Sequence, residues 1–331
     1  MIEVGALRIL MTGGSGFIGT NLVEHFLHRG CEVLNLDVAA PRNSAQAAHW
    51  HCVDLLDSSG LRAAIAAFSP QIVLHMGART DLDGRSVSDY AANVQGVSNI
   101  IQAIEDLPSL RRVVFASSRL VCRIGYQPTD EFDCCPTTAY GESKVLGEKL
   151  VRASAARIGC PWSIVRPTSI WGPWFDVPYK TFFLSVAKGQ YVQPGRQSIL
   201  KSFGFVGNTV HQLQGLIDAQ PEAVSGHTFY LGDYPPLDLA SMANAIQKSL
   251  GASPLRTVRP GVLRCAARAG DLLKALGWRN PPLTSFRLDN LLTPMVYDLE
   301  SLRSVIGDLP YTMEQGVKIT VDWLKAHGDI V

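Results

Sequence analysis

Short apolar runs alternate with longer, partly polar stretches through the first half of the chain. The apolar runs, which we predict as strands, are residues 8–12, 31–37, 72–75, 112–116 and 162–166. The stretches that we predict as helices are residues 16–29, 61–68, 87–107 and 138–158. Short apolar strands that alternate with helices are typical of a parallel sheet covered on both faces. The pattern therefore predicts a doubly wound, Rossmann-like α/β fold for this half.

The regular alternation ends near residue 170, where proline, glycine and aromatic residues accumulate in the segments RPTSIWGPWFDVPY, YVQPGRQ and GDYPPLD. Helices are still predicted at residues 239–250, 262–276 and 313–325. We expect a Rossmann-like domain over residues 1–170, to which a late strand near residues 227–231 returns. Residues 171–331 are then mainly a smaller, irregular α/β domain that binds substrate.

Composition excludes several classes of function. The net charge of the 331 residues is only +1, which disfavours a nucleic-acid or membrane partner. The seven cysteines show no CxxC spacing, so we expect neither a disulfide framework nor a metal site. The sequence begins without the pattern of a signal peptide, and no apolar run approaches the roughly 20 residues of a membrane span. We therefore expect a cytoplasmic protein.

A glycine-rich turn follows the first predicted strand. Residues 12–19 read TGGSGFIG, with glycines at 13, 16 and 19. Gly13 permits a turn that a side chain would block, Gly16 lets a pyrophosphate approach the backbone, and Gly19 lets the helix pack closely on the sheet. The N–H groups at the start of the helix then face the phosphates. A strand, this turn and a helix in this order predict a dinucleotide site.

Asp37 ends the second predicted strand. Its carboxylate is expected to accept hydrogen bonds from the 2′-hydroxyl of the adenine ribose and to repel a 2′-phosphate, which favours NAD over NADP. Arg42 lies close in sequence and leaves NADP open as an alternative. Asp54 is expected to meet the adenine edge together with the Leu55 backbone, and the alternative is a solvated loop acid.

A tyrosine and a lysine share one face of a predicted helix, at positions i and i+4 of the segment YGESK. A phenol with a pKa of about 10 is a poor base at neutral pH, and a nearby ammonium lowers that pKa. Tyr140, beside Lys144, is therefore expected to exchange a proton with an alcohol or a ketone. Ser117 and Ser118 end the fourth strand, at the sheet edge where ligands bind, and Ser118 is expected to share the reacting oxygen.

Together these motifs resemble the extended short-chain dehydrogenase/reductase family, in its NAD-dependent epimerase/dehydratase group. The similar segments are TGGSGFIG (12–19), NLD (35–37), DLLD (54–57), HMGA (75–78), NVQG (93–96), SSRLV (117–121), YGESK (140–144) and RPTSIWGP (166–173). They follow the family's order from about residue 8 to 175, with weaker matches at SFGFVGN (202–208) and near residue 298.

The resemblance implies roles for particular residues. The implied catalytic residues are Ser118, Tyr140 and Lys144. The implied contacts of NAD are Gly13, Gly16, Phe17, Ile18, Gly19, Asp37, Asp54, Leu55, Gly77, Ala78, Arg79, Asn93, Ser117, Tyr140, Lys144, Arg166 and Pro167. The candidates for substrate binding are Arg119, Thr168, Arg196, Lys201 and Arg287. Arg196, Lys201 and Arg287 are proposed for a diphosphate, because two phosphate charges need basic partners. Each of these three cations is equally consistent with an ordinary surface residue.

The family acts mostly on nucleotide-diphosphate sugars, and its members are often homodimers that pack two long helices, here 87–107 and 138–158. The chain departs from the family's pattern at Met76 and Gly77, where two alanines are common, and at Arg119, where a small residue is usual. Arg119 either faces the substrate or is a solvated surface arginine. The Thr-Asp-Glu pattern of the sugar 4,6-dehydratases is absent.

The expected activity is therefore an NAD-dependent nucleotide-sugar epimerase, acting on a UDP-sugar at C4 through a transient 4-keto sugar. The alternative is a net NAD(P)-dependent dehydrogenase or ketoreductase of a sugar or a sterol-like alcohol. A regulatory protein that binds the dinucleotide without chemistry is disfavoured, because Tyr140 and Lys144 are both present.

Overall fold

A seven-stranded parallel sheet forms the centre of the protein, in a computed structural model that describes residues 6–278, 281 and 283–330. The strand order is β11-β6-β5-β4-β1-β2-β3. The strands are β1 (Arg8–Thr12), β2 (Glu32–Asp37), β3 (Trp50–Cys52), β4 (Ile72–His75), β5 (Arg112–Ala116), β6 (Trp162–Pro167) and β11 (Thr228–Leu231). Every pairing between them is parallel, which confirms the predicted Rossmann-like α/β fold. The strand order reverses between β1 and β4, and ligands bind at such a point in open α/β sheets.

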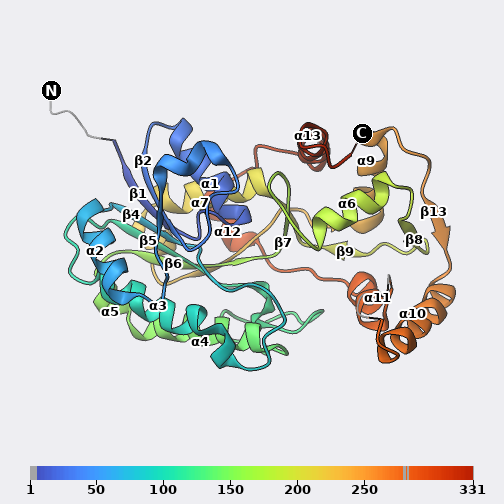
Figure 1. Cartoon of the computed structure of the whole chain (residues 1–331), viewed down its shortest axis with the longest axis horizontal. Helices are drawn as coiled ribbons and strands as arrows, with labels where there is room; N and C mark the ends of the chain where they lie inside the picture. The colour runs from blue at the N-terminus through green and yellow to red at the C-terminus, as the bar shows by residue number, and fades with distance from the viewer. Residues whose placement is uncertain (1–5, 279–280, 282, 331) are drawn as a thin grey trace.

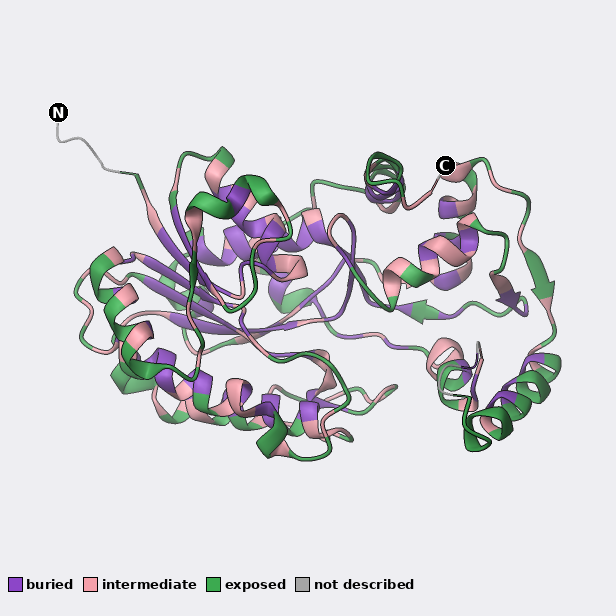
Figure 2. Ribbon diagram, viewed as in Figure 1, coloured by how far each residue is buried: buried purple, intermediate pink, exposed green. Residues whose placement is uncertain are grey.

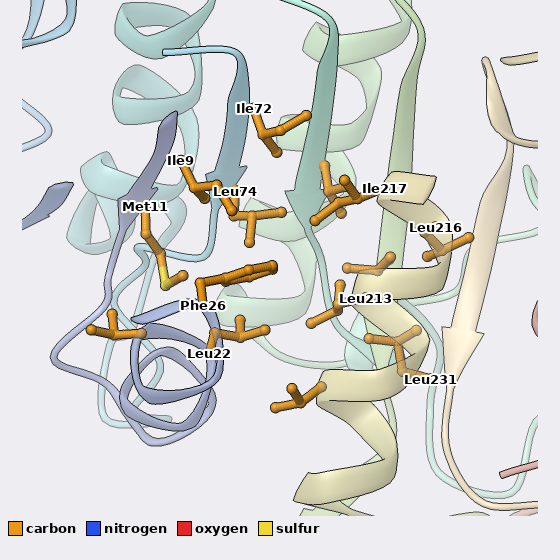
Figure 3. Close-up of a cluster of buried hydrophobic side chains, with 14 of the residues drawn as sticks. Ile9, Met11, Leu22, Phe26, Ile72, Leu74, Leu213, Leu216, Ile217 and Leu231 are labelled. Atoms are coloured by element: carbon orange, nitrogen blue, oxygen red, sulfur yellow. The ribbon is translucent and has the colours of Figure 1, made fainter. Parts of the chain in front are cut away.

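Side chains that alternate along the strands separate two cores. On one face, Ile9 and Met11 of β1 pack with helices α1 (Phe17–His28) and α7 (Val206–Asp218) (Figures 1 and 3). On the other face, Leu10 packs with helices α2 (Ser58–Phe68), α3 (Ala91–Ile104), α4 (Ala139–Ala153) and α5 (Ala155–Ile158). The inner strands of the sheet are almost entirely buried between the two layers, whereas the edge strand β3 is largely exposed (Figure 2). Burial on both faces explains why the sequence shows continuous apolar runs rather than alternation.

Two of the predicted long helices are interrupted. The segment predicted at 87–107 begins as a 3-10 turn, η2 (Val87–Tyr90). A capping box between Ser86 and Asp89 caps the N-terminus of this turn. The segment predicted at 138–158 breaks at Ser154, which ends α4 and precedes α5. At Ser86 a local capping box starts the short turn, whereas the backbone of Ser154 leaves the helical conformation, with φ −99° and ψ 10°, without a side-chain cap. The apolar spacing of the sequence reveals neither feature.

The second half of the chain contributes to the sheet as well as to its own core. Helices α7 and α12 (Glu300–Ile306), which the sequence pattern does not predict, pack on the same side of the sheet as α1. A separate core joins α6 (Tyr179–Ala187), α9 (Leu239–Leu250) and α13 (Met313–Ala326). We therefore propose a division in which α7, β11 and α12 belong with the Rossmann-like unit, although they lie after residue 170.

The remaining elements are short or peripheral. They are η1 (Ser44–His49), η3 (Arg119–Val121), β7 (Ser169–Trp171), β8 (Val192–Pro194), β9 (Leu200–Lys201), β10 (Phe203–Phe205), α8 (Pro221–Val224), β12 (Leu237–Asp238), β13 (Arg256–Val258), α10 (Pro260–Ala275) and α11 (Ser285–Leu292). Helices α10 and α11 form a small outlying pair at the end opposite the N-terminus (Figure 1). Within the described part of the chain, no helix is both long and apolar enough to cross a membrane.

Candidate active site

A cleft of about 670 Å³ opens at the carboxyl ends of the central strands. Its lining joins the turn after β1, the end of β2, the segment after β4 and the end of β5. Of the residues predicted for the cofactor or for catalysis, the cleft is lined by Gly13, Gly16, Phe17, Ile18, Gly19, Asp37, Asp54, Leu55, Gly77, Ala78, Arg79, Ser117, Ser118, Tyr140, Lys144 and Pro167. The fold thus brings together residues that lie as far apart in sequence as Gly13 and Pro167.

The glycine turn leaves no room for side chains at two positions. Gly13 has a φ of +70°, and a Cβ atom there would lie 2.5 Å from the backbone nitrogen of Gly77. A Cβ atom on Gly19 would overlap the carbonyl oxygen of Gly13. Gly16 caps α1 without a side-chain hydrogen bond, so N–H groups of the first turn remain available to a ligand. The turn therefore has the form of a phosphate cradle at a helix N-terminus.

The carboxylate of Asp37 is held beside this turn. It accepts hydrogen bonds from the backbone nitrogens of Ser15, at 3.1 Å, and Ala39, at 3.0 Å. Arg42 also lines the cleft, but its guanidinium donates to the carbonyl oxygen of Trp174 and lies 3.9 Å from the carboxylate of Asp176. Asp37 is negatively charged, and the Arg42 guanidinium already has other partners. This end of the cleft therefore fits the 2′-hydroxyl of an adenine ribose better than a 2′-phosphate.

Ser118 and Tyr140 face each other across the end of β5. The Oγ atom of Ser118 accepts a hydrogen bond from the backbone nitrogen of Leu120 at 3.1 Å and thereby caps η3. The Ser118 side chain lies close enough to Tyr140 to lower the pKa of its phenol, and both residues line the cleft. The Tyr140 ring is buried and packs edge-on against Tyr90. This arrangement places two hydroxyls where a single substrate oxygen can meet both.

The pKa values of Tyr140 and Lys144 do not follow the expectation from the sequence, in which the ammonium lowers the pKa of the phenol. Burial raises the pKa of Tyr140, and the hydrogen bond from Ser118 and the charge of Arg119 only partly oppose this rise. Burial lowers the pKa of Lys144 to about 8, although Glu148 acts in the opposite direction. In the protein alone, Lys144 therefore does not produce the expected low pKa of Tyr140. The reason is that its ammonium points to the carbonyl oxygen of Ala116, at 3.0 Å.

A histidine supports the floor of the cleft and was not predicted as functional. The Oγ1 atom of Thr12 lies 2.8 Å from Nδ1 of His75 and accepts a hydrogen bond from the Gly77 nitrogen at 3.1 Å. Burial, with a smaller effect of the Lys144 charge, lowers the pKa of His75 to about 3, so its ring is neutral at pH 7. The sequence signal that could have identified His75 is the segment HMGA at 75–78, which follows a strand into the cleft and begins with this polar residue.

Asn93 holds the backbone of Arg79, a residue that lines the cleft. Its side chain accepts from the Arg79 nitrogen at 2.8 Å and donates to the Arg79 carbonyl oxygen at 3.0 Å and to Ser143 Oγ at 3.0 Å. It is buried and is not among the residues that line the cleft. Asn93 therefore acts on a cofactor only through the backbone that it fixes, and a direct contact is not supported.

Arg166 lies away from the cleft, contrary to its predicted cofactor contact. Its guanidinium forms a two-point ion pair with Glu148, at 2.9 and 2.8 Å, and also bonds to Tyr230. It borders a separate, larger cavity of about 1340 Å³, whose lining includes none of Ser118, Tyr140 and Lys144. The side chain is fully buried, and a buried charge requires such a partner.

The residues predicted for substrate binding do not gather in one place. Thr168 lines the cleft, and its hydroxyl donates to the Leu231 carbonyl oxygen at 2.7 Å. Lys201 is buried and donates to two backbone carbonyls, whereas Arg196 and Arg287 are exposed and are absent from the cleft lining. Arg119 is half-buried and is absent from the cleft lining, and its Nη1 atom lies 3.4 Å from the sulfur of Met295.

The lining fits a nicotinamide dinucleotide. The glycine cradle suits a pyrophosphate, and Asp37 suits a ribose hydroxyl. The buried Oγ atom of Ser117 lines the cleft and has no hydrogen-bond partner within the described residues, which leaves a polar contact for a ligand. When bound, such a cofactor supplies reversible hydride transfer next to Ser118 and Tyr140.

Comparisons with known proteins agree with this geometry. Residues 9–191 match the family described as "NAD dependent epimerase/dehydratase family". The chain is 26% identical to a 3-beta-hydroxysteroid dehydrogenase of Mycolicibacterium neoaurum, over 94% of this chain and 89% of that protein. It is 25% identical to the N-acetyl-alpha-D-glucosaminyl-diphospho-ditrans,octacis-undecaprenol 4-epimerase of Escherichia coli O157:H7, over 97% of this chain and 96% of that protein.

Among solved structures, the UDP-glucose 4-epimerase of Thermus thermophilus in complex with NAD superposes with a TM-score of 0.71. The two chains are 22% identical, and the match covers 96% of this chain and 99% of the other. At this level of identity the likeness supports the shared fold.

Proposed function

The chain belongs to the NAD dependent epimerase/dehydratase family, and on this premise we propose that it is a nucleotide-sugar epimerase that acts at C4 of a UDP-sugar. It is an NAD-dependent enzyme of the extended short-chain dehydrogenase/reductase type. The observation that best supports the proposal is that Ser118, which follows β5, lines the cofactor cleft together with Tyr140 and Lys144.

In the proposed reaction, the Tyr140 oxygen removes the proton of the C4 hydroxyl while Ser118 holds the same oxygen. Bound NAD would supply the reversible hydride transfer at C4. Loss of one hydride from C4 and one proton from its hydroxyl gives the 4-keto sugar; return of the hydride to the opposite face of C4 and of the proton to the oxygen gives the epimer. Lys144 is placed by its bond to the Ala116 carbonyl oxygen. In the protein alone burial raises the pKa of Tyr140, so the proposal requires the positive charge of a bound nicotinamide, together with the Lys144 ammonium, to lower it.

A second candidate is a net dehydrogenase or ketoreductase of a sugar or sterol-like alcohol. It is favoured by the positions of the cations predicted for a diphosphate. Arg196 and Arg287 are exposed away from the cleft, and the Lys201 ammonium is engaged by the carbonyl oxygens of Asn290 and Thr293, at 2.8 and 2.9 Å. The similarity to a 3-beta-hydroxysteroid dehydrogenase points the same way.

The test is an NMR time course with a panel of UDP-sugars and a 3β-hydroxysteroid, with NAD far below substrate. An epimer formed in excess over NAD supports the epimerase. A ketone matched one-for-one by NADH supports the dehydrogenase and contradicts the epimerase. Tyr140→Phe removes the proton acceptor and is expected to lower either rate by about 10²–10⁴-fold, while NAD binding, followed by fluorescence, persists.

We also propose a homodimer in which α3 and α4 of two chains pack together. Both helices lie on the outer layer of the sheet, and Leu146 of α4 is exposed. Light scattering after size-exclusion chromatography tests this. Leu146→Glu is expected to shift a dimer to a monomer, because it places charge in an apolar contact, and a wild-type monomer would contradict the proposal.

A further inference from the structure

Helix α10 carries two apolar stripes, and the fold covers only one of them. Leu263 and Ala267 are buried in a small core with Leu288 of α11. The second stripe, which we call the outer stripe, has the helical spacing i, i+4, i+7, i+11 and i+14 and therefore lies on one face. Its members are Val262, Ala266, Ala269, Leu273 and, at the C-cap, Leu276. All five of these residues are exposed.

The large side chains of the outer stripe are open to solvent. The exposed fraction is 58% for Val262, 39% for Leu273 and 75% for Leu276, and Leu272 beside them is 62% exposed. Trp278, which is 52% exposed, extends the stripe beyond the helix. Its backbone nitrogen donates to the Leu273 carbonyl oxygen at 3.0 Å, a closure that returns the chain to the last turn. Apolar side chains gathered in this way mark a binding surface, whereas single exposed ones do not.

Cations border the outer stripe. Arg264 and Arg268 lie one turn apart on α10, and Arg268 lies one turn before Leu272. The described residues between 256 and 292 include six cations and two acids, although the whole chain has a net charge of only +1. None of these eight takes part in an ion pair within the described part of the chain. The net charge, from which we expect no membrane partner, therefore conceals a local excess of positive charge.

The charge and position of this face select its partner. Helix α10 belongs to an outlying pair and is exposed over most of its length (Figures 1 and 2). A second copy would bring its own arginines toward these, and like charges repel. Anionic lipids supply the opposite charge, and a helix with leucine and tryptophan beside arginine suits the boundary between headgroups and acyl chains. We propose that the outer stripe docks on the surface of an anionic lipid bilayer, with α10 lying in the plane of the headgroups.

Vesicle flotation tests this proposal. The purified protein is mixed at low salt with vesicles of phosphatidylcholine alone, or of phosphatidylcholine and phosphatidylglycerol in equal parts. The variants are Leu273→Glu, in the outer stripe, and the double variant Arg264→Gln, Arg268→Gln. Ile319→Glu is the matched control, because Ile319 is a helical residue of α13 whose exposed fraction is 38%. Unaltered circular dichroism and NAD affinity verify that each variant folds.

The wild-type protein is expected to bind the anionic vesicles at least about 10-fold more tightly than the neutral ones, and less tightly as salt is added. Leu273→Glu should lower the affinity for anionic vesicles at least about 10-fold. The double arginine variant should lower it by a similar factor, and Ile319→Glu should leave it unchanged. Absence of binding, equal binding to both kinds of vesicle, or full binding by Leu273→Glu overturns the proposal.

The fluorescence of Trp278 identifies the face that docks. Brominated acyl chains quench an indole that reaches them, so the wild-type protein should lose emission on anionic vesicles that contain such lipids. Trp278→Phe should lose much less, because phenylalanine still suits the interface but the quenched indole is gone. Equal quenching of the two proteins would mean that a different face meets the bilayer, and the proposal would then fail.

A second copy of the chain is the other occupant of this face, and it gives a different result. If the wild-type protein does not float with anionic vesicles, and Leu273→Glu lowers the mass measured by light scattering, the outer stripe is an interface between copies and the lipid proposal is wrong. Neither result depends on the proposed epimerase, whose turnover is measured without vesicles.

Discussion

The ammonium of Lys144 donates a hydrogen bond of 3.0 Å to the carbonyl oxygen of Ala116, the last residue of β5. The helix that supplies the lysine is thereby fixed to the strand whose end supplies Ser117 and Ser118. The cost of this arrangement is a buried positive charge, since burial lowers the pKa of Lys144 to about 8.

Replacing Lys144 by methionine is expected to stabilise the folded protein while turnover is lost. The pKa of Lys144 in the folded protein lies below its ordinary value of 10.5, so the unfolded chain binds the proton more tightly. Lys144→Met should therefore stabilise the fold below pH 8 by about 1–2 kcal/mol, after the loss of one hydrogen bond is subtracted. The gain should decline as the pH rises from about 8 to above 10.5, because the lysine then becomes neutral in both states.

Urea unfolding of wild type and Lys144→Met across pH 6–11 measures this difference, and turnover should be lost at every pH. A difference in unfolding free energy that does not change with pH would mean that Lys144 is not destabilised by burial of its charge.

Asp37 is expected to set the choice between NAD and NADP. Asp37→Asn removes the charge that repels a 2′-phosphate, so the affinity for NADP relative to NAD should rise by about 10-fold. Fluorescence titration with each cofactor measures the ratio. Asp54→Asn is the control, because Asp54 lies in the same cleft and caps the Leu56 nitrogen. It should weaken both cofactors equally, and an unchanged ratio in Asp37→Asn would refute the role of Asp37.

Two helical glycines should respond oppositely to alanine. In Gly19→Ala the new methyl would overlap the Gly13 carbonyl oxygen, so we expect a loss of about 1–3 kcal/mol in stability and weaker NAD binding. At Gly261 in α10 an added Cβ meets no atom within 4 Å. Gly261→Ala should stabilise the protein by about 0.5–1 kcal/mol, since alanine favours helix. Thermal unfolding with and without NAD measures both, and equal effects would contradict the close approach at Gly19.

Arg166 is expected to matter for stability and not for the cofactor. Arg166→Met removes the bidentate partner of the buried Glu148 carboxylate and leaves it only the longer ion pair with Arg152, at 3.5 Å, which should cost about 3 kcal/mol. The double variant Arg166→Met, Glu148→Met should recover most of this loss, because neither charge then remains buried. Arg196→Met, at an exposed position, should change stability by less than about 0.5 kcal/mol.

Chemical denaturation measures these free energies, and NAD titration should give the wild-type affinity for each variant that folds. Reduced NAD affinity in the double variant would restore the cofactor role that the sequence suggested for Arg166.

The central strands, the order of the Rossmann-like fold and the proposed catalytic motif can all be predicted from the sequence. These depend on short-range rules. Tyr140 and Lys144 share a face because they are four residues apart on a helix, and the glycines at 13, 16 and 19 act within one turn. Parallel strands place their carboxyl ends at one edge, so the residues after β1, β4 and β5 had to converge.

Which polar side chains form hydrogen bonds and ion pairs within the fold, and are therefore not available to a ligand, becomes clear only in three dimensions. Arg166 meets Glu148 and Tyr230, which are 18 and 64 positions away, and Asn93 meets Arg79 and Ser143. No local pattern encodes such pairs, because they arise from the packing of separate helices and strands. The same holds for Arg119, whose guanidinium meets the sulfur of Met295, 176 positions later in the chain. A buried charge acquires a function only through the partners that the complete fold supplies or withholds.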